Sequence, residues 1–146
     1  MEPLLETVNI LDKDGFWVTQ YISDGATSSN YDAFFIALYP CEVVAIGETH
    51  RVAGTNGGAV TLNIEKLTSG QALDAGSVLL TTEINLKGTA NTPQLFSVND
   101  KDFVFTNVRQ LDVGDRLALK DTGTLTSVAG VQVTVYFKRL GKGHYQ

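Results

Sequence analysis

The chain has 146 residues, of which 43% are hydrophobic and 18% charged, a composition typical of one folded domain. Its formal net charge of −5 argues against a protein that binds nucleic acid by neutralising phosphates. No apolar run approaches the ~20 residues that span a bilayer. The start, Met1-Glu2-Pro3, lacks the basic region of a signal peptide, so we expect a soluble protein made in a cytoplasm.

Three segments are expected along the chain. Residues 1–15 have no strong period and are predicted to form an N-terminal arm or an edge strand; their last four residues, Asp12-Lys13-Asp14-Gly15, favour a turn. Residues 16–140 carry short runs of high β-propensity separated by small and polar residues, and are predicted to form the folded domain. Residues 141–146 are expected to be a flexible tail.

The first predicted strand, Phe16–Ile22, is rich in aromatic and β-branched residues. Trp17 and Tyr21 fall on the same face of this strand because side chains alternate with a period of two. Such aromatics could stack on a sugar ring, but a core or subunit-contact role is commoner for them.

The most apolar part of the chain is residues 33–46. Phe34, Ile36 and Leu38 are expected to line one face of a strand. The residues of the opposite face, Phe35, Ala37 and Tyr39, are apolar too, and Pro40 then indicates a bend or bulge. A strand that is apolar on both faces lies either between two layers or against another subunit, and the sequence leaves both arrangements open.

The middle of the chain continues the strand pattern. Residues 54–58 form a glycine-rich turn whose Asn56-Gly57 pair is a strong hairpin signal. Residues 60–65 and 79–86 alternate between apolar and polar side chains, and each run is predicted to be a strand. Between them, residues 69–77 could hold a short helical turn.

Residues 111–140 are predicted to be two strands of one sheet joined by a small-residue loop, with a turn at Gly114-Asp115 opening the first. In the last strand, Val131, Val133, Val135 and Phe137 alternate with polar residues, which indicates one buried face. About eight short strands with no room for a βαβ unit predict an all-β fold, an antiparallel two-sheet sandwich of jelly-roll-like type.

No motif specifies a reaction, a metal or a cofactor, and we predict a protein that is not an enzyme. Glu48 and His50 could cooperate as a carboxylate and an imidazole, but no nucleophile accompanies them, so we interpret them as solvated residues at a strand end. Cys41 lies in an apolar run and is expected to be a buried thiol. Four acidic residues could hold a cation only if the fold gathered them, and we interpret them as turn residues. They are Asp100, Asp102, Asp112 and Asp115.

Two stretches of the chain resemble small virion proteins of tailed bacteriophages. They are residues 59–92 (AVTLNIEKLTSGQALDAGSVLLTTEINLKGTANT) and residues 111–140 (LDVGDRLALKDTGTLTSVAGVQVTVYFKRL). The shared elements are a strand ending in Glu65-Lys66-Leu67-Thr68, the run Leu86–Thr92, the turn and strand Gly114–Leu119, and the loop Thr124–Ala129. The first third of the chain departs from the shared pattern.

The resemblance implies a jelly-roll-like head decoration or cement protein, often a homotrimer, that binds the major capsid protein on the outside of the head and stabilises it. The alternative that it leaves open is a head-fibre or tail-associated module that binds a receptor or glycan. Localisation is then the virion surface after synthesis in the host cytoplasm, with no nucleic acid, membrane or small-molecule ligand expected. The candidate subunit or capsid contacts are Phe35, Ala37, Tyr39, Trp17 and Tyr21.

Overall fold

The computed structural model describes residues 15–28, 32–99, 101–104 and 106–140, so the predicted arm, apart from Gly15, and the predicted tail lie outside the described residues. The strands in chain order are β1 (Gly15–Ile22), β2 (Phe35–Ile36), β3 (Cys41–Thr49), β4 (Thr61–Leu67), β5 (Ser77–Val78), β6 (Ile84–Asn85), β7 (Gln94–Ser97), β8 (Gln110–Leu111), β9 (Arg116–Thr122) and β10 (Val131–Arg139). A short helix, α2 (Thr106–Arg109), precedes β8. The prediction of an all-β chain is confirmed.

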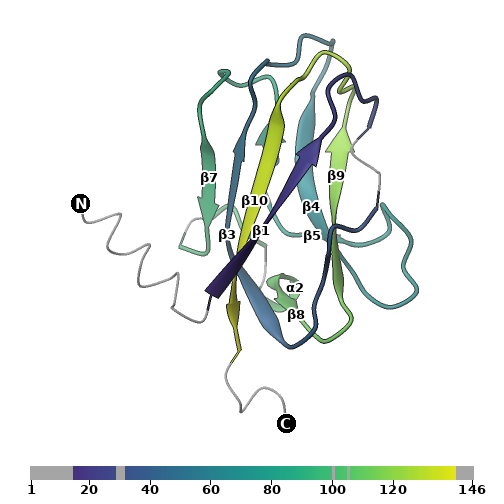
Figure 1. The fold of residues 1–146 in the computed structure, drawn as a ribbon, viewed down its shortest axis with the longest axis vertical. Coiled ribbons are helices and arrows are strands. Elements are labelled where there is room, and N and C mark those ends of the chain that lie inside the picture. Colours follow the sequence, from purple (N-terminus) through teal and green to yellow (C-terminus); the bar gives the residue numbers. More distant parts are fainter. Residues whose placement is uncertain (1–14, 29–31, 100, 105, 141–146) are drawn as a thin grey trace, which may run out of the picture.

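Two antiparallel sheets form the molecule. The first sheet has the order β1-β10-β3-β7, with β8 paired to β3, and lies at the front of Figure 1. The second sheet has the order β2-β9-β4-β5, with β6 paired to β4. All of these strand pairs are antiparallel, which confirms the predicted two-sheet sandwich.

The core lies between the two sheets and is centred on β10. Val131, Val133, Val135 and Phe137 are at most 2% exposed, while the residues between them are partly exposed, so the predicted alternation is confirmed. The Phe137 ring stacks on two others, with its centroid 4.8 Å from that of Phe16 and 4.3 Å from that of Phe35. One inward-facing side chain of β10 thereby joins β1 to β2, the edge strands of opposite sheets.

Two predicted strand pairings are wrong. Asn56-Gly57 does not close a hairpin, because β3 belongs to the first sheet and β4 to the second. Likewise β9 and β10 lie in opposite sheets and are not neighbours in one sheet. In both places the chain crosses from one layer to the other. Turn residues specify a change of direction, whereas burial of both inner faces decides which strand becomes the neighbour.

The predicted strand over residues 79–86 is also wrong, since only the two-residue strands β5 and β6 form in this part of the chain. Leu79 and Leu80 are consecutive and both buried, so the segment cannot keep the alternation of a regular strand. The Asn63 side chain takes the place of ladder bonds here, because its Oδ1 accepts from Leu80 N at 3.1 Å and its Nδ2 donates to Leu80 O at 2.9 Å. Residues 69–77 contain turns and no helix.

The apolar segment 33–46 is divided between the sheets. β2 is two residues long, and the chain then crosses from the second sheet to the first before β3 begins at Cys41. Ala37 N donates to Asp115 O at 2.8 Å, and Ala37 O accepts from Gly114 N at 2.8 Å, which ties the crossing to the turn before β9. The segment is therefore not one continuous strand, and neither predicted arrangement, between two layers or against another subunit, describes it as a whole.

Removing the Phe137 ring tests the central role of β10. Phe137→Ala should lower the free energy of unfolding by about 3–5 kcal/mol, because it leaves a cavity beside two stacked rings. Urea titration followed by far-UV circular dichroism measures the change. Leu38→Ala is the matched control, since Leu38 is 79% exposed and its truncation should cost less than about 0.5 kcal/mol. Equal effects of the two substitutions would contradict this account of the core.

Candidate functional site

Three rows of side chains cross the outward side of the first sheet, and together they are called the outer face. The pairing registers give the rows as Trp17-Tyr136-Ala45-Ser97, Thr19-Thr134-Gly47-Leu95 and Tyr21-Gln132-Thr49. None of these residues is charged, and Lys138 comes one row beyond the Trp17 row. The outer face thus differs from the chain as a whole, 18% of whose residues are charged.

Large apolar side chains project from both edges of the outer face. Trp17 and Tyr21 on β1 are 67% and 65% exposed, and Leu95 on β7 is 75% exposed. Trp17 stacks on Tyr136 with ring centroids 6.3 Å apart, and the Thr19 and Thr134 hydroxyls are hydrogen-bonded at 3.0 Å. Trp17 and Tyr21 share one face of β1, as predicted from the sequence, and the structure shows that this face is exposed. Exposed apolar side chains grouped in this way are common on interaction surfaces.

A shallow hollow of about 230 Å³ lies over β3 within the outer face. Its lining residues are Gly47, Glu48, Thr49, Pro93, Leu95, Gln132 and Thr134. The hollow exists because Gly47 has no side chain, and a Cβ atom there would stand 3.3 Å from Leu95 Cδ2. The outer face is consequently low over β3 and raised at its two edge strands, β1 and β7.

The second sheet has no comparable bare face in the described part of the chain, because the segment after β4 covers its outward side. Asn63, Glu65 and Ala118 point outward from this sheet, yet they are 3%, 0% and 0% exposed. Glu65 holds the covering segment, since its carboxylate accepts from Asp74 N and Gly76 N at 2.8 Å each. Among the described residues, a segment of the chain covers the outward side of the second sheet, and none covers that of the first.

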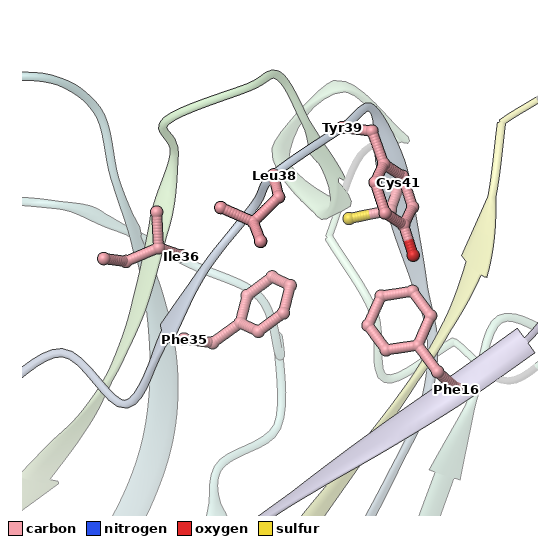
Figure 2. A pocket seen from close by; sticks show the side chains of 6 residues that line it. All are labelled: Phe16, Phe35, Ile36, Leu38, Tyr39 and Cys41. Atoms are coloured by element: carbon pink, nitrogen blue, oxygen red, sulfur yellow. The ribbon is translucent and has the colours of Figure 1, made fainter.

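A second hollow, of about 140 Å³, lies where β1 and β2 approach each other (Figure 2). It is lined by Phe16, Phe35, Ile36, Leu38, Tyr39 and Cys41. Its volume is close to that of a cavity that holds one benzene ring, so it can admit a single apolar side chain. Arg139 lies at its rim, with the guanidinium carbon 4.8 Å from the Tyr39 ring centroid.

The predicted contact residues separate into two groups. Trp17 and Tyr21 lie on the outer face, whereas Phe35 and Tyr39 are half-buried at the second hollow. Ala37 is 1% exposed and packs in the core, so its prediction as a contact residue is corrected. The exposed apolar residues of that segment are Ile36 and Leu38, at 55% and 79%. Exposure still alternates along residues 36–38, and the exposed side is the one opposite to the predicted contact residues.

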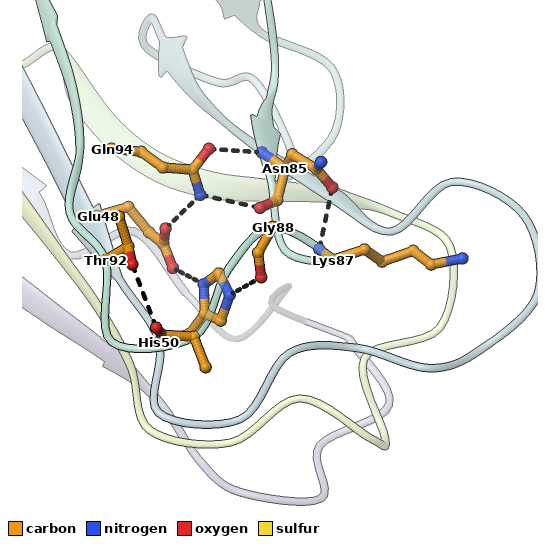
Figure 3. A network of polar contacts seen from close by, with 8 residues as sticks. Glu48, His50, Asn85, Lys87, Gly88, Thr92 and Gln94 are labelled. Atoms are coloured by element: carbon orange, nitrogen blue, oxygen red, sulfur yellow. Dashed lines mark hydrogen bonds and ion pairs between the residues drawn. The ribbon is translucent and has the colours of Figure 1, made fainter.

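Glu48 and His50 are buried, at 3% and 1% exposed, so their interpretation as solvated residues is wrong. Figure 3 shows the network around them. His50 Nδ1 lies 2.7 Å from Glu48 Oε1, and His50 Nε2 lies 2.9 Å from the Gly88 carbonyl oxygen. Gln94 Nε2 donates to Glu48 Oε2 at 2.7 Å and to Asn85 O at 2.8 Å.

This network is a structural cross-link between the end of β3 and residues 85–94. A carbonyl oxygen can only accept, so His50 Nε2 carries a proton, and a second proton bridges His50 Nδ1 and Glu48 Oε1. Both ring nitrogens and both carboxylate oxygens therefore already have protein partners. A period of two from the buried Ile46 places Glu48 and His50 on the inner side, and this was the sequence signal for their burial.

The other candidate chemical groups are also structural. Cys41 is 0% exposed, and burial, together with the charge of Asp115, raises the pKa of its thiol to about 12, which confirms the predicted buried thiol. Asp115 accepts from Asp112 N at 2.9 Å within the turn before β9. Among the residues that the structure describes, no three acidic, histidine or cysteine side chains are grouped to hold a metal ion; Asp100 is outside them. Within the same residues, no helix has the length and hydropathy to cross a membrane.

Comparison with known proteins adds little to this picture. No family model matches the chain, and no curated protein matches it. Among solved structures, "Structure of infectious bursal disease virus Gx strain" aligns with 90% of this chain at 13% identity and a TM-score of 0.30. The alignment covers 38% of the chain of that virus. A similarity of this strength carries no argument about function.

The buried network should make stability depend on pH. Burial raises the pKa of Glu48 above its usual range, although the hydrogen bond and charge of His50 and the hydrogen bond of Gln94 act in the opposite direction. The folded chain therefore holds the Glu48 proton more tightly than the unfolded chain does. The stability that this proton contributes is present at low pH and is lost as the pH rises above about 4.3, the ordinary glutamate value.

Glu48→Gln isolates this effect, because glutamine does not titrate. We expect the free energy of unfolding of the wild type, minus that of Glu48→Gln, to fall as the pH rises above about 4.3. Urea unfolding at a series of pH values measures it. Glu83→Gln, at an exposed glutamate, is the control and should leave the pH profile parallel to that of the wild type. A parallel profile for Glu48→Gln would refute the assignment.

Proposed function

We propose that this chain is a non-enzymatic structural protein of a tailed-bacteriophage virion, a head decoration or cement protein that binds the major capsid protein from outside and stabilises the shell. The observation that carries the proposal is the outer face, which no described segment covers and whose three rows hold no charged residue, on a chain of net charge −5. In this proposal the chain is made in the host cytoplasm and is a homo-oligomer on the capsid surface, with a homotrimer expected.

The chemistry of the outer face suits a protein partner. Aromatic residues are enriched at protein interfaces, and charged residues are depleted from interface cores. Trp17 and Tyr21 supply the aromatic area, and the threonines around them supply hydroxyls that need little desolvation because Thr19 and Thr134 already bond to each other. A contact at such a face gains apolar burial without separating an ion pair from water.

A symmetric shell would strengthen a modest contact. When one subunit of a homo-oligomer binds, it holds the other subunits near the next identical sites, so their effective concentration reaches about the millimolar range. A small face can then saturate a lattice although a single contact is weak. A weak contact is therefore sufficient for a protein that binds a shell in many copies. It is less suited to a protein that must bind one soluble partner through a single contact.

The parts of the chain that resemble phage virion proteins are parts of the scaffold. Gly114–Leu119 is the turn and first half of β9, and Thr124–Ala129 is the crossing from β9 to β10. Glu65 ends the matching strand and holds the segment that covers the second sheet. Support for a non-enzymatic role comes from Glu48 and His50, whose polar atoms all have protein partners.

Binding to heads tests the proposal. Heads of the phage that encodes this chain, assembled without it, are mixed with the purified protein and sedimented. We expect saturable co-sedimentation, and Trp17→Ser should raise the apparent Kd about 30-fold, as for an interface hot spot. Val113→Ser is the control, because Val113 is 64% exposed but lies outside the outer face. No co-sedimentation at about 100 µM protein would overturn the proposal, since shell binding at such concentrations needs only weak contacts.

The second candidate function is glycan or receptor binding by a fibre or tail module. The observation that favours it is the exposure of Trp17 and Tyr21 beside the Gln132 amide, a combination that can stack on a sugar and bond its hydroxyls. Binding on a glycan array that is lost in Trp17→Ala, with no binding to heads, would favour this function. An empty array would exclude the sugars it displays.

A further inference from the structure

We infer that the second hollow, between β1 and β2, is the docking site for the chain's own N-terminal segment, residues 1–14, and that the Leu11 side chain enters it. The segment lies outside the described residues and joins β1 beside the hollow. The second hollow is separate from the outer face, so its occupant and the proposed capsid contact are tested independently.

The second hollow lies at an open seam of the sandwich. β1 and β2 are edge strands of opposite sheets, and they pair with β10 and β9 and not with each other. Figure 2 shows Phe16 of β1 and Phe35 of β2 on either side of the hollow. Cys41 also lines it and is 0% exposed, whereas Ile36 is 55% exposed, so the hollow leads from the surface down to the core. An apolar side chain placed there would remove this apolar surface from water.

The N-terminal segment enters the first sheet directly beside the hollow. Phe16, the second residue of β1, lines the hollow, and Leu11 comes five residues before it. The sequence of residues 12–15 (DKDG) favours a type I turn, with Asp at its first position and Gly at its fourth. The ends of such a turn lie within about 7 Å of each other. A chain that reverses at this turn brings Leu11 back to Phe16.

Leucine fits the second hollow in size and chemistry. The volume of about 140 Å³ is close to that of a cavity that holds a benzene ring, which is larger than the side chain of leucine. The lining side chains are apolar apart from the Tyr39 hydroxyl and the Cys41 thiol. The Tyr39 hydroxyl already accepts a hydrogen bond from Arg139 Nε. Leucine would therefore leave no strongly hydrogen-bonding side chain of the lining without a partner.

Charge at the rim favours this segment as the occupant. Residues 1–14 hold four acidic residues and one basic residue, Lys13. The Arg139 guanidinium carbon lies 5.8 Å from the Phe16 ring centroid, and Lys138 precedes Arg139 at the end of β10. Among the described residues, no carboxylate forms an ion pair with either of these cations. An acidic segment with apolar side chains complements an apolar hollow that has a basic rim.

The segment of the same copy is favoured over the segment of a second copy. A segment tethered this close to its site has an effective concentration in about the millimolar range or above. A second copy in micromolar solution is far more dilute, and its docking would also cost translational and rotational entropy. The inferred contact therefore closes the seam within one molecule and leaves the outer face free for the capsid.

Limited proteolysis of the full chain tests the docking. Lys13 is the first lysine or arginine of the sequence, so tryptic release of residues 1–13, measured by mass spectrometry, reports how often the segment leaves the hollow. We expect Leu11→Ser to accelerate this cleavage about tenfold or more, because a buried leucine is lost. Leu4→Ser is the matched control and should be cleaved at the wild-type rate, since Leu4 does not enter the hollow.

A substitution in the hollow tests the other side of the contact. Ile36→Glu adds a negative charge where the acidic segment docks, so it should accelerate the same cleavage by a similar factor. It should fold, because Ile36 is 55% exposed. Leu95→Glu makes a similar change at a residue that is 75% exposed on the outer face, and it should be cleaved as the wild type is. Far-UV circular dichroism checks that both variants are folded.

Cross-linking distinguishes the chain's own segment from that of another copy. In a Cys41→Ala background, Leu11→Cys combined with Ile36→Cys should form an intramolecular disulfide faster than Leu4→Cys combined with Ile36→Cys. Disulfide-linked dimers as the main product would overturn the inference, because the segment of a second copy would then be the occupant. Equal tryptic cleavage of the wild type and Leu11→Ser would overturn it as well, as would equal acceleration by Leu4→Ser and Leu11→Ser.

Discussion

The burial of one side of β10 is the constraint on which the rest of the molecule depends. Val131, Val133, Val135 and Phe137 fill the space between the sheets, and β10 lies between β1 and β3 in the first sheet. Because these four residues must face inward, the residues between them must face outward. The same alternation passes to β1 and β3 through the pairing registers. The outer face is therefore a direct consequence of how the core is packed.

The outward sides of the two sheets differ in their residues and in what covers them. Glu65 and Asn63 would be poor residues for a buried position, but both polar side-chain atoms of each are hydrogen-bonded to the segment that folds over the second sheet. The first sheet keeps uncharged residues in the three rows of its outward side, which a partner can cover without burying an unpaired charge. Function is proposed for the first sheet because its surface is the one that the described residues leave uncovered.

Local patterns were sufficient to predict the fold class but not the connections. The alternation in β10 and the shared face of Trp17 and Tyr21 follow from a period of two, which any strand obeys. The partners of a strand depend on distant residues, so the Asn56-Gly57 turn gave no sign that β3 and β4 lie in opposite sheets. Ala37 was misplaced because both faces of residues 34–39 are apolar, so the alternation did not indicate which face is buried. The hollow over Gly47 could not be predicted, since it needs the register of three strands.

The cross-link between Glu48, His50 and residues 85–94 has a consequence for the shape of the outer face. β3 carries Gly47 and Thr49 outward while Glu48 between them points inward to His50 and Gln94. The same inward bonds anchor Gln94, the first residue of β7, beside Pro93 and Leu95. These hydrogen bonds on the inner side of the sheet thus fix the β3 and β7 residues that line the hollow. A surface supported in this way is preorganised. A binding partner therefore finds the hollow already formed, and little conformational entropy of this chain is lost on binding.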